Sequence, residues 1–411
     1  MPVLVPVEEI QPGMRLVEPI VSRGRIMLQS HKALTAQDLS VLKRRYPGLC
    51  VRVSDPVLDD VIDFEDDSQD RNIASETQQK IAESMSEVRE RFSERASLGG
   101  AQLGAIQEAV NEIMLYFQGH PNTAALLSRS LDPSHHLSTH TGNVFYLSML
   151  LGSMVKGYVA AERKRQTSAR NLRPSVALDL TPLGLGSFFM DLGMIPLQNL
   201  LENDHPLTEL DRRAIQNHPN AGANTLPERF SAAAKMIVRT HHENFDGTGY
   251  PKGMPGEKLH VFSRIVRIAD AFDSATADRV YKKAKSPARA LWEMSVGPYR
   301  RFYDPELMKA FSRLIQPFPI GSKLRLEDGR YAVVTRYNRW KPFKPSIVIS
   351  FDPHGNPLPK SPMEGPLCLE DEPDFRIKSF RGEDLSYIYE RNVPHEPVRR
   401  QFATFYESVY P

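Results

Sequence analysis

The spacing of hydrophobic residues predicts a small α+β module at the start of the chain. Residues 1 to about 58 alternate short apolar stretches with turns, as strands do. The stretches are Val3–Val7, Arg15–Val21, Arg25–Leu28 and Cys50–Val53. Between the third and fourth, Thr35 and Asp38 have the spacing of a helix-capping pair, and Leu39, Leu42 and Tyr46 follow along one side. We expect this N-terminal module to span residues 1–58.

An acidic segment follows the first module. Seven of the twelve residues from 59 to 70 are Asp or Glu, which is too much like charge for a packed element. A stretch from about Ser75 to Phe92 has a thin apolar stripe at helical spacing. We predict a linker and a helix over residues 59–98. This helix is a signalling helix, the contact of a homodimer or a solvated helix.

The rest of the chain changes from a helical pattern to a strand pattern. Apolar residues recur every three or four positions from about 100 to 315, which predicts a helical domain over residues 99–316. After Pro319, strands are predicted at Lys323–Leu326, Tyr331–Thr335 and Ser346–Phe351, with a turn at Asp328-Gly329. The fold class is therefore mainly α, with a β-rich C-terminal module and tail over residues 317–411.

One polar segment interrupts the helical pattern. Residues 156–173 carry Arg163, Lys164, Arg165, Arg170 and Arg173. We expect a solvated surface insertion here, and the alternative is a basic lid or a contact for a partner.

Composition excludes several classes of protein. The 411 residues have a formal charge of +2 and 25% charged residues, so nothing favours binding to long nucleic acid. No apolar run approaches the roughly 20 residues needed to span a bilayer, and the first residues lack a basic, then apolar, signal segment. The two cysteines, Cys50 and Cys368, lie far apart, which argues against a disulfide framework. We expect a cytoplasmic protein without a membrane anchor.

The densest cluster of chemically active residues lies at 241–251, which read His-His-Glu-Asn-Phe-Asp-Gly-Thr-Gly-Tyr-Pro. Two neighbouring imidazoles can bind two different ions, and the glycines permit a tight turn. The run resembles the HHExxDGxGYP signature of the HD-GYP family, whose members are metal-dependent hydrolases of cyclic di-GMP. The resemblance implies an HD-type helical bundle and a metal-assisted phosphodiesterase site.

The resemblance also implies a set of metal ligands. Asp191 corresponds to the bridging, catalytic carboxylate, and His136 is an additional candidate one helical turn before His140. The implied metal ligands are His136, His140, Asp191, His218, His241, His242 and Asp270. We expect two or fewer divalent ions, with iron or manganese preferred.

A second set of residues resembles the part of the family site that binds the substrate. Arg279 and Lys282 match cations that hold the phosphates of the dinucleotide, and Tyr250 matches the tyrosine that lies against the ligand. We add Asp273, one turn after Asp270, to this set. The implied ligand is cyclic di-GMP or a related cyclic dinucleotide.

The chain departs from the family where the name-giving His-Asp pair should stand. The matching stretch, residues 188–196, has Met190 in place of the histidine and Met194 in place of a lysine, while Asp191 is retained. A thioether is a weak ligand for Mn²⁺, Fe²⁺ or Mg²⁺, so one metal position should be weakened or empty. Binding of the dinucleotide without efficient hydrolysis is the reading we favour. Slow hydrolysis to pGpG or GMP, or a scaffold whose GYP surface contacts a signalling protein, are the alternatives.

Overall fold

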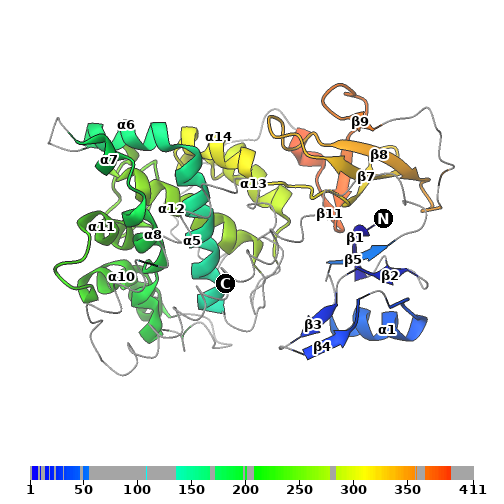
Figure 1. Ribbon diagram of the computed structural model, residues 1–411, viewed down its shortest axis with the longest axis horizontal. Coiled ribbons are helices and arrows are strands. Elements are labelled where there is room, and N and C mark those ends of the chain that lie inside the picture. Colours follow the sequence, from blue (N-terminus) through cyan, green and yellow to red (C-terminus); the bar gives the residue numbers. More distant parts are fainter. Residues whose placement is uncertain are drawn as a thin grey trace. The chain divides into compact units, whose positions relative to one another are not determined.

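The computed structural model shows two compact units (Figure 1). It describes residues 2–54 with short gaps, Glu108, and residues 136–389 apart from 167–171, 198–199, 201–207, 278–283, 357, 359–360 and 361–365. One unit contains the N-terminal residues, Ser286–Arg289 and Ile315–Val393, and the other contains most of the helices. The predicted acidic linker and the helix at Ser75–Phe92 lie outside the described residues.

The N-terminal residues form the predicted α+β arrangement. Strand β5 (Cys50–Ser54) lies between β1 (Pro2–Pro6) and β2 (Arg15–Leu16), and each of these two strands pairs with it antiparallel. Strands β3 (Ile20–Ser22) and β4 (Arg25–Leu28) make a separate pair. Helix α1 (Ala36–Arg45) begins with the predicted capping box, in which the Thr35 side chain accepts from the Asp38 amide and the Asp38 carboxylate accepts from the Thr35 amide.

The C-terminal residues form a six-stranded antiparallel sheet with the strand order β11-β10-β6-β7-β8-β9. The predicted strands are β6 (Lys323–Leu326), β7 (Tyr331–Arg336) and β8 (Ser346–Phe351). The others are β9 (Leu367–Cys368), β10 (Ile377–Phe380) and β11 (Glu383–Asp384), followed by the short helix η7 (Ser386–Tyr389). Gly329 has a positive φ of 91° in the turn between β6 and β7, as the Asp-Gly pair predicts.

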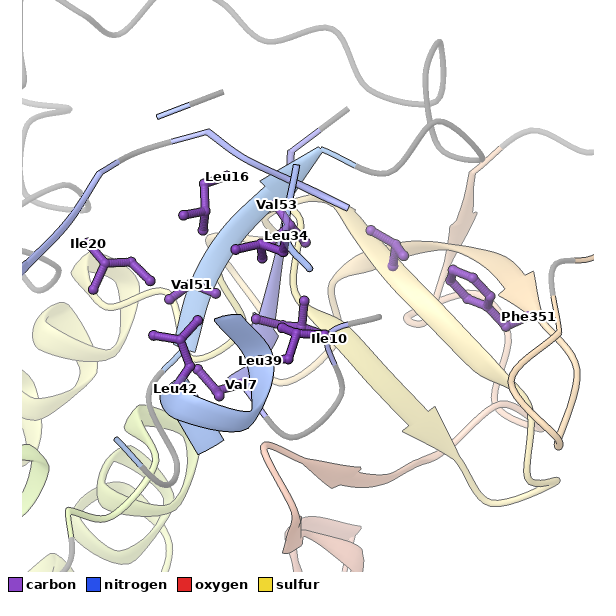
Figure 2. Packing of buried hydrophobic residues seen from close by; sticks show 11 residues of the cluster. Val7, Ile10, Leu16, Ile20, Leu34, Leu39, Leu42, Val51, Val53 and Phe351 are labelled. Carbon is purple, nitrogen blue, oxygen red and sulfur yellow. The ribbon is translucent and has the colours of Figure 1, made fainter. Parts of the chain in front are cut away.

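Strand β7 is buried on both faces, and this joins the two sheet regions. Val333 packs in one hydrophobic cluster with Val7, Leu16 and Val53 of the N-terminal residues. Figure 2 shows this cluster, to which Phe351 of β8 also belongs. Ala332 and Val334 belong to the other cluster, on the C-terminal sheet. Since successive side chains of a strand point to opposite faces, one apolar run serves two cores, and the N-terminal and C-terminal parts share one compact unit.

Every described element from 136 to 314 is helical, and the fold is mainly α. The helices in the first half are α5 (His136–Met154), α6 (Lys156–Gln166), α7 (Pro174–Ala177), α8 (Thr181–Phe188), η4 (Leu192–Leu197) and α10 (Glu209–Thr225). Those in the second half are α11 (Ala232–Thr240), η5 (Gly256–Lys258), α12 (Val261–Thr276), α13 (Pro287–Ser295), η6 (Arg300–Phe302) and α14 (Pro305–Leu314). Helix α12 is buried along nearly all its length and packs against α5, α11 and α14. It therefore forms the centre of the bundle.

Part of the polar segment at 156–173 is a packed helix, so the prediction of a solvated insertion is wrong for residues 156–166. Arg163 of α6 is buried, and its guanidinium donates to the carbonyl oxygens of Val176, Ala177 and Asp179. These carbonyls lie at the end of α7, where backbone acceptors have no partner within the helix. Residues 167–171 lie outside the described part of the chain.

By length and composition alone, residues Pro174–Leu197 could cross a membrane, since an 18-residue window within them has a mean hydropathy of 1.3. In the fold they are divided among α7, α8 and η4. About two thirds of the apolar window (67%) is buried inside the protein, as in the core helices of many bundles.

Candidate metal centre

A close backbone contact brings the segment of Asp191 against helix α10. A Cβ atom on Gly193 would lie 2.2 Å from the carbonyl oxygen of His218, and the same Cβ would lie 2.9 Å from the amide nitrogen of Gly222. Only glycine permits two backbones to approach this closely. The contact places Asp191, two residues before Gly193, beside His218.

His218 and His241 direct their Nε2 atoms toward one point. Nδ1 of His218 lies 2.6 Å from the carbonyl oxygen of Ile215, and Nδ1 of His241 lies 2.9 Å from that of Val238. A carbonyl only accepts, so both Nδ1 atoms carry the proton, and in the neutral ring Nε2 is then an acceptor. The two Nε2 atoms nevertheless lie 3.2 Å apart.

Asp191 adds a third acceptor to the same point. Its Oδ1 lies 3.4 Å from Nε2 of His218 and 3.7 Å from Nε2 of His241. With His242, these side chains offer four ligand atoms that all lie within 4.8 Å of one another. Converging lone pairs repel one another unless a cation lies between them, so this donor set fits a divalent metal.

The second oxygen of Asp191 faces a different donor set. Oδ2 of Asp191 lies 3.5 Å from Nε2 of His140, which in turn lies 3.3 Å from Oδ1 of Asp270. Asp191 thus lies between the imidazoles of α10 and α11 on one side and His140 and Asp270 on the other. A carboxylate in that position can bridge two ions.

His140 is held by its other ring nitrogen. Nδ1 donates to Oδ2 of Asp273 at 2.6 Å, and Asn143, one turn along α5, donates to Oδ1 of Asp273 at 2.6 Å. Burial lowers the pKa of His140, but hydrogen bonds to Asp270 and Asp273 outweigh this effect and raise the pKa to about 10. A proton or a cation at His140 therefore stabilises the acids around it.

His242 connects the metal centre to the turn that follows it. Its Nδ1 lies 3.5 Å from Oδ2 of Asp270, and its ring stacks on Tyr250 with centroids 4.8 Å apart. Burial holds the pKa of His242 well below its usual value, and neighbouring His241 adds to the effect. The neutral ring keeps a lone pair for a metal.

The turn itself is fixed by backbone contacts. Both carboxylate oxygens of buried Glu243 accept from backbone amides, those of Lys252 and Met254, at 2.7 and 2.9 Å. Gly249 packs so tightly that a Cβ atom there would lie 2.2 Å from the amide nitrogen of Asn244. These contacts explain the Glu and the second Gly of the motif as structural requirements of the turn.

The acids of the centre are ionised in spite of burial. Burial raises the pKa of Asp191, but the imidazoles of His218 and His241 beside its carboxylate hold it well below the usual value. Burial likewise opposes ionisation of Asp270, and the hydrogen bond from His140 overcomes it, so the pKa of Asp270 is also lowered. Two buried carboxylates among several imidazoles are suited to a dication.

The two donor sets differ in how many imidazoles they contain. Met190, which directly precedes Asp191, is fully buried, and Met194 of η4 is buried as well. Among the described residues, this set has His140 as its imidazole, and the thioether of Met190 is a poor substitute for another. The two sides of Asp191 therefore present different donor sets.

The structure brings six of the seven candidate metal ligands together from five segments. His140 comes from α5, Asp191 from the turn before η4, His218 from α10, the two adjacent histidines from the end of α11, and Asp270 from α12. His136 begins α5, but its side chain lies outside the described part, as do Arg279 and Lys282. Tyr250 and Asp273 border the centre on its turn side and on its α5 side, respectively.

Comparison with known proteins agrees with this geometry. A family model described as an HD domain matches residues 167–307, the segment that contains Asp191, His218, His241 and Asp270. The chain is 30% identical over 181 residues to the cyclic di-GMP phosphodiesterase PA4108 of Pseudomonas aeruginosa. The helical domain contains an HD domain. Its run at 241–251 carries the HHExxDGxGYP pattern of the HD-GYP family.

Other matches cover different shares of the chain. The chain is 34% identical over 137 residues to a cyclic di-GMP phosphodiesterase of Vibrio cholerae. This match covers 31% of this chain and 28% of that protein. A solved HDG"Y"P protein from Bdellovibrio bacteriovorus, Bd1817, aligns with a TM-score of 0.45 and 15% identity, over 76% of this chain and 98% of that one. The match to PA4108 covers 43% of each chain, so less than half of that relative is represented.

Proposed function

We propose that this HD-GYP protein binds a cyclic dinucleotide at a metal-dependent phosphodiesterase-type site whose hydrolytic activity is impaired. The observation that carries the proposal is the asymmetry about Asp191. One of its oxygens faces the imidazoles of His218 and His241, and the other faces His140 and Asp270. Met190, which directly precedes Asp191 in the chain, is buried. The first donor set fits an ion well, while the second lacks the imidazole that the family pattern has at position 190.

The ligand class rests on the relatives. PA4108 and the Vibrio cholerae relative described above are cyclic di-GMP phosphodiesterases. A 3'3'-cGAMP-specific phosphodiesterase of Vibrio cholerae is 33% identical over 132 residues. Tyr250, stacked on His242, has an aromatic face of the kind that contacts a base. We propose that Arg279 and Lys282 hold the phosphates, because a guanidinium and an ammonium suit phosphate oxygens.

The residues would divide the chemistry as follows. His218, His241, His242 and Asp191 would hold one ion, of iron or manganese, and Asp191 would share a second with His140 and Asp270. Divalent ions supply positive charge against the phosphate and make a water molecule more acidic. A weak second position reduces stabilisation of the transition state more than binding of the ground state, so the ligand can be bound without being cleaved efficiently.

The test combines metal analysis with ligand binding on the full chain. Purified protein should contain iron or manganese at fewer than two ions per chain by elemental analysis. Calorimetry with cyclic di-GMP and Mn²⁺ should show binding at micromolar concentration or below, and chromatography should show little linear product. Protein with neither metal nor dinucleotide binding would contradict the proposal and would leave the scaffold as the remaining reading.

An active phosphodiesterase is the second candidate. The observation that favours it is that Asp191, His140 and Asp270 still converge in the second donor set. This candidate predicts two ions per chain and steady conversion of cyclic di-GMP to pGpG or GMP in the same assay.

A further inference from the structure

Arg267 is a buried cation beside the acids of the metal centre. It lies on α12 three residues before Asp270, and only 5% of it is exposed. Its Nη1 lies 3.6 Å from Oδ2 of Asp270, and its Nε donates to Oδ1 of Asn244 at 3.0 Å. The guanidinium carbon lies 5.6 Å from the ring centroid of Tyr303. One planar group thus contacts three neighbours in different directions, which fixes its orientation.

Asn244 continues this connection into the turn of the signature motif. Its amide group donates to Oγ1 of Thr248 at 3.1 Å, and that hydroxyl donates to Oδ1 of Asp246 at 2.6 Å. The Asp246 oxygen also accepts from the Thr248 amide at 3.1 Å. Arg267 therefore links the carboxylate of Asp270 to the turn that carries Tyr250.

The contacts of Asp270 show what this link does. Oδ1 of Asp270 faces His140, while Oδ2 faces His242 and Arg267. The contact of Oδ2 with Arg267 keeps Oδ1 directed toward His140 and Asp191, the other members of the second donor set. Partners that orient a metal ligand typically contribute 10 to 100-fold to metal affinity.

We infer that Arg267 is a positioning residue that holds Asp270 and the Asn244 turn in a single arrangement suited to ion binding. The inference rests on the proposed function, since it assumes that Asp270 binds an ion. It adds a residue that the resemblance to the family did not supply, and it assigns the buried charge of Arg267 a role beyond stability.

The same helix offers a matched control. Arg264, one turn earlier, is equally buried, but it pairs with Glu162 at 2.8 Å and Asp304 at 3.0 Å, which are not candidate ligands. Replacing either arginine removes a buried cation from α12. Only replacement of Arg267 removes a contact to a candidate metal ligand.

The experiment compares Arg267→Met, Arg267→Lys and Arg264→Met in the full chain. Each protein is stripped of metal and titrated with Mn²⁺ by calorimetry, and thermal unfolding is followed without metal. We expect Arg267→Met to weaken Mn²⁺ binding at least ~10-fold and Arg267→Lys to recover part of the affinity, because Lys keeps the charge near Asp270. Arg264→Met should lower the unfolding temperature with less than ~3-fold change in affinity.

The outcomes are distinguishable. Wild-type affinity in Arg267→Met, or equal losses of affinity in both Met variants, would overturn the positioning role while leaving the proposed function in place. Absence of Mn²⁺ binding by the wild-type chain would overturn both. If Arg267→Met does not fold, Asn244→Ala removes one arm of the link, and it must also weaken Mn²⁺ binding for the inference to stand.

Discussion

Nδ1 of His140 donates a hydrogen bond to Oδ2 of Asp273 across 2.6 Å, and this contact joins α5 to α12 at the metal centre. The side-chain amide of Asn143 donates a hydrogen bond to Oδ1, the other oxygen of the same carboxylate. A carboxylate behind an imidazole fixes the ring and its tautomer, so that the opposite nitrogen is presented to a metal. We placed Asp273 among the ligand-contacting residues from the sequence, and its contacts now favour a role in orienting His140.

Asp273→Asn should weaken metal binding without unfolding the protein. An amide can still accept from Nδ1 of His140, but it lacks the charge that supports the ring, so we expect Mn²⁺ affinity to fall ~10-fold or more. Calorimetry on metal-stripped protein measures this change. Asn143→Ala, which leaves the carboxylate in place, is the control and should lower the Mn²⁺ affinity less than Asp273→Asn does. Equal affinity for Asp273→Asn and the wild type would remove the orienting role.

Restoring the family residues should restore the second metal position. In Met190→His with Met194→Lys, the new imidazole directly precedes Asp191 on the chain and the new ammonium adds positive charge near the site. We expect metal content to rise toward two ions per chain and hydrolysis of cyclic di-GMP to rise at least ~10-fold. Met190→Leu with Met194→Leu is the matched control for packing. More metal without faster hydrolysis would mean that the defect lies elsewhere in the site.

The sequence was most informative where the chemistry restricts the choice of residues. His241 and His242, followed by an acid and two glycines, are hard to explain by packing alone, and the matching positions of His140, Asp191 and His218 follow from the same resemblance. The structure brings these side chains together from separate helices. Local signals were also sufficient for the Thr35 capping box and the turn at Gly329.

Features that depend on long-range packing were not predictable in the same way. Arg163 lies in a basic run that resembles a solvated face, yet carbonyls 13 to 16 residues away accept from it. Val333 packs against the N-terminal residues because both faces of β7 are covered, and a short apolar run does not reveal its partners. Arg267 appears in the sequence as one more helix charge, and only the fold places it between Asp270 and Asn244.

Gly193→Ala should disrupt the metal centre through the backbone. The added Cβ would overlap the carbonyl oxygen of His218 at 2.2 Å, and backbone cannot yield as a flexible side chain can. We expect a loss of about 3 kcal/mol or more in the free energy of unfolding, measured with urea, together with loss of Mn²⁺ binding. Gly157→Ala in α6, where nothing lies within 4 Å of the new Cβ, should stabilise by up to about 1 kcal/mol. Unchanged stability and Mn²⁺ binding in Gly193→Ala would show that η4 and α10 lie farther apart than the structure places them.

His260 should make the stability of the helical domain depend on pH. It caps α12, and its Nδ1 accepts from the Phe262 amide at 3.2 Å. Burial, together with the charges of Arg163 and Arg264, lowers the pKa of His260 to about 4. Because the unfolded chain then binds a proton more readily than the folded one, stability is highest above the unfolded pKa of about 6.5 and falls as the pH drops toward 4.

His260→Asn tests this effect, because Asn keeps an acceptor for the Phe262 amide but has no ionisable ring. From the two pKa values, the wild type should lose about 2 kcal/mol more free energy of unfolding than the variant between pH 7 and pH 5. Urea unfolding of both proteins across that range measures the difference, and the other titrating groups cancel because both chains share them. Parallel pH profiles for the two chains would mean that His260 is solvated well enough to charge freely in the folded state.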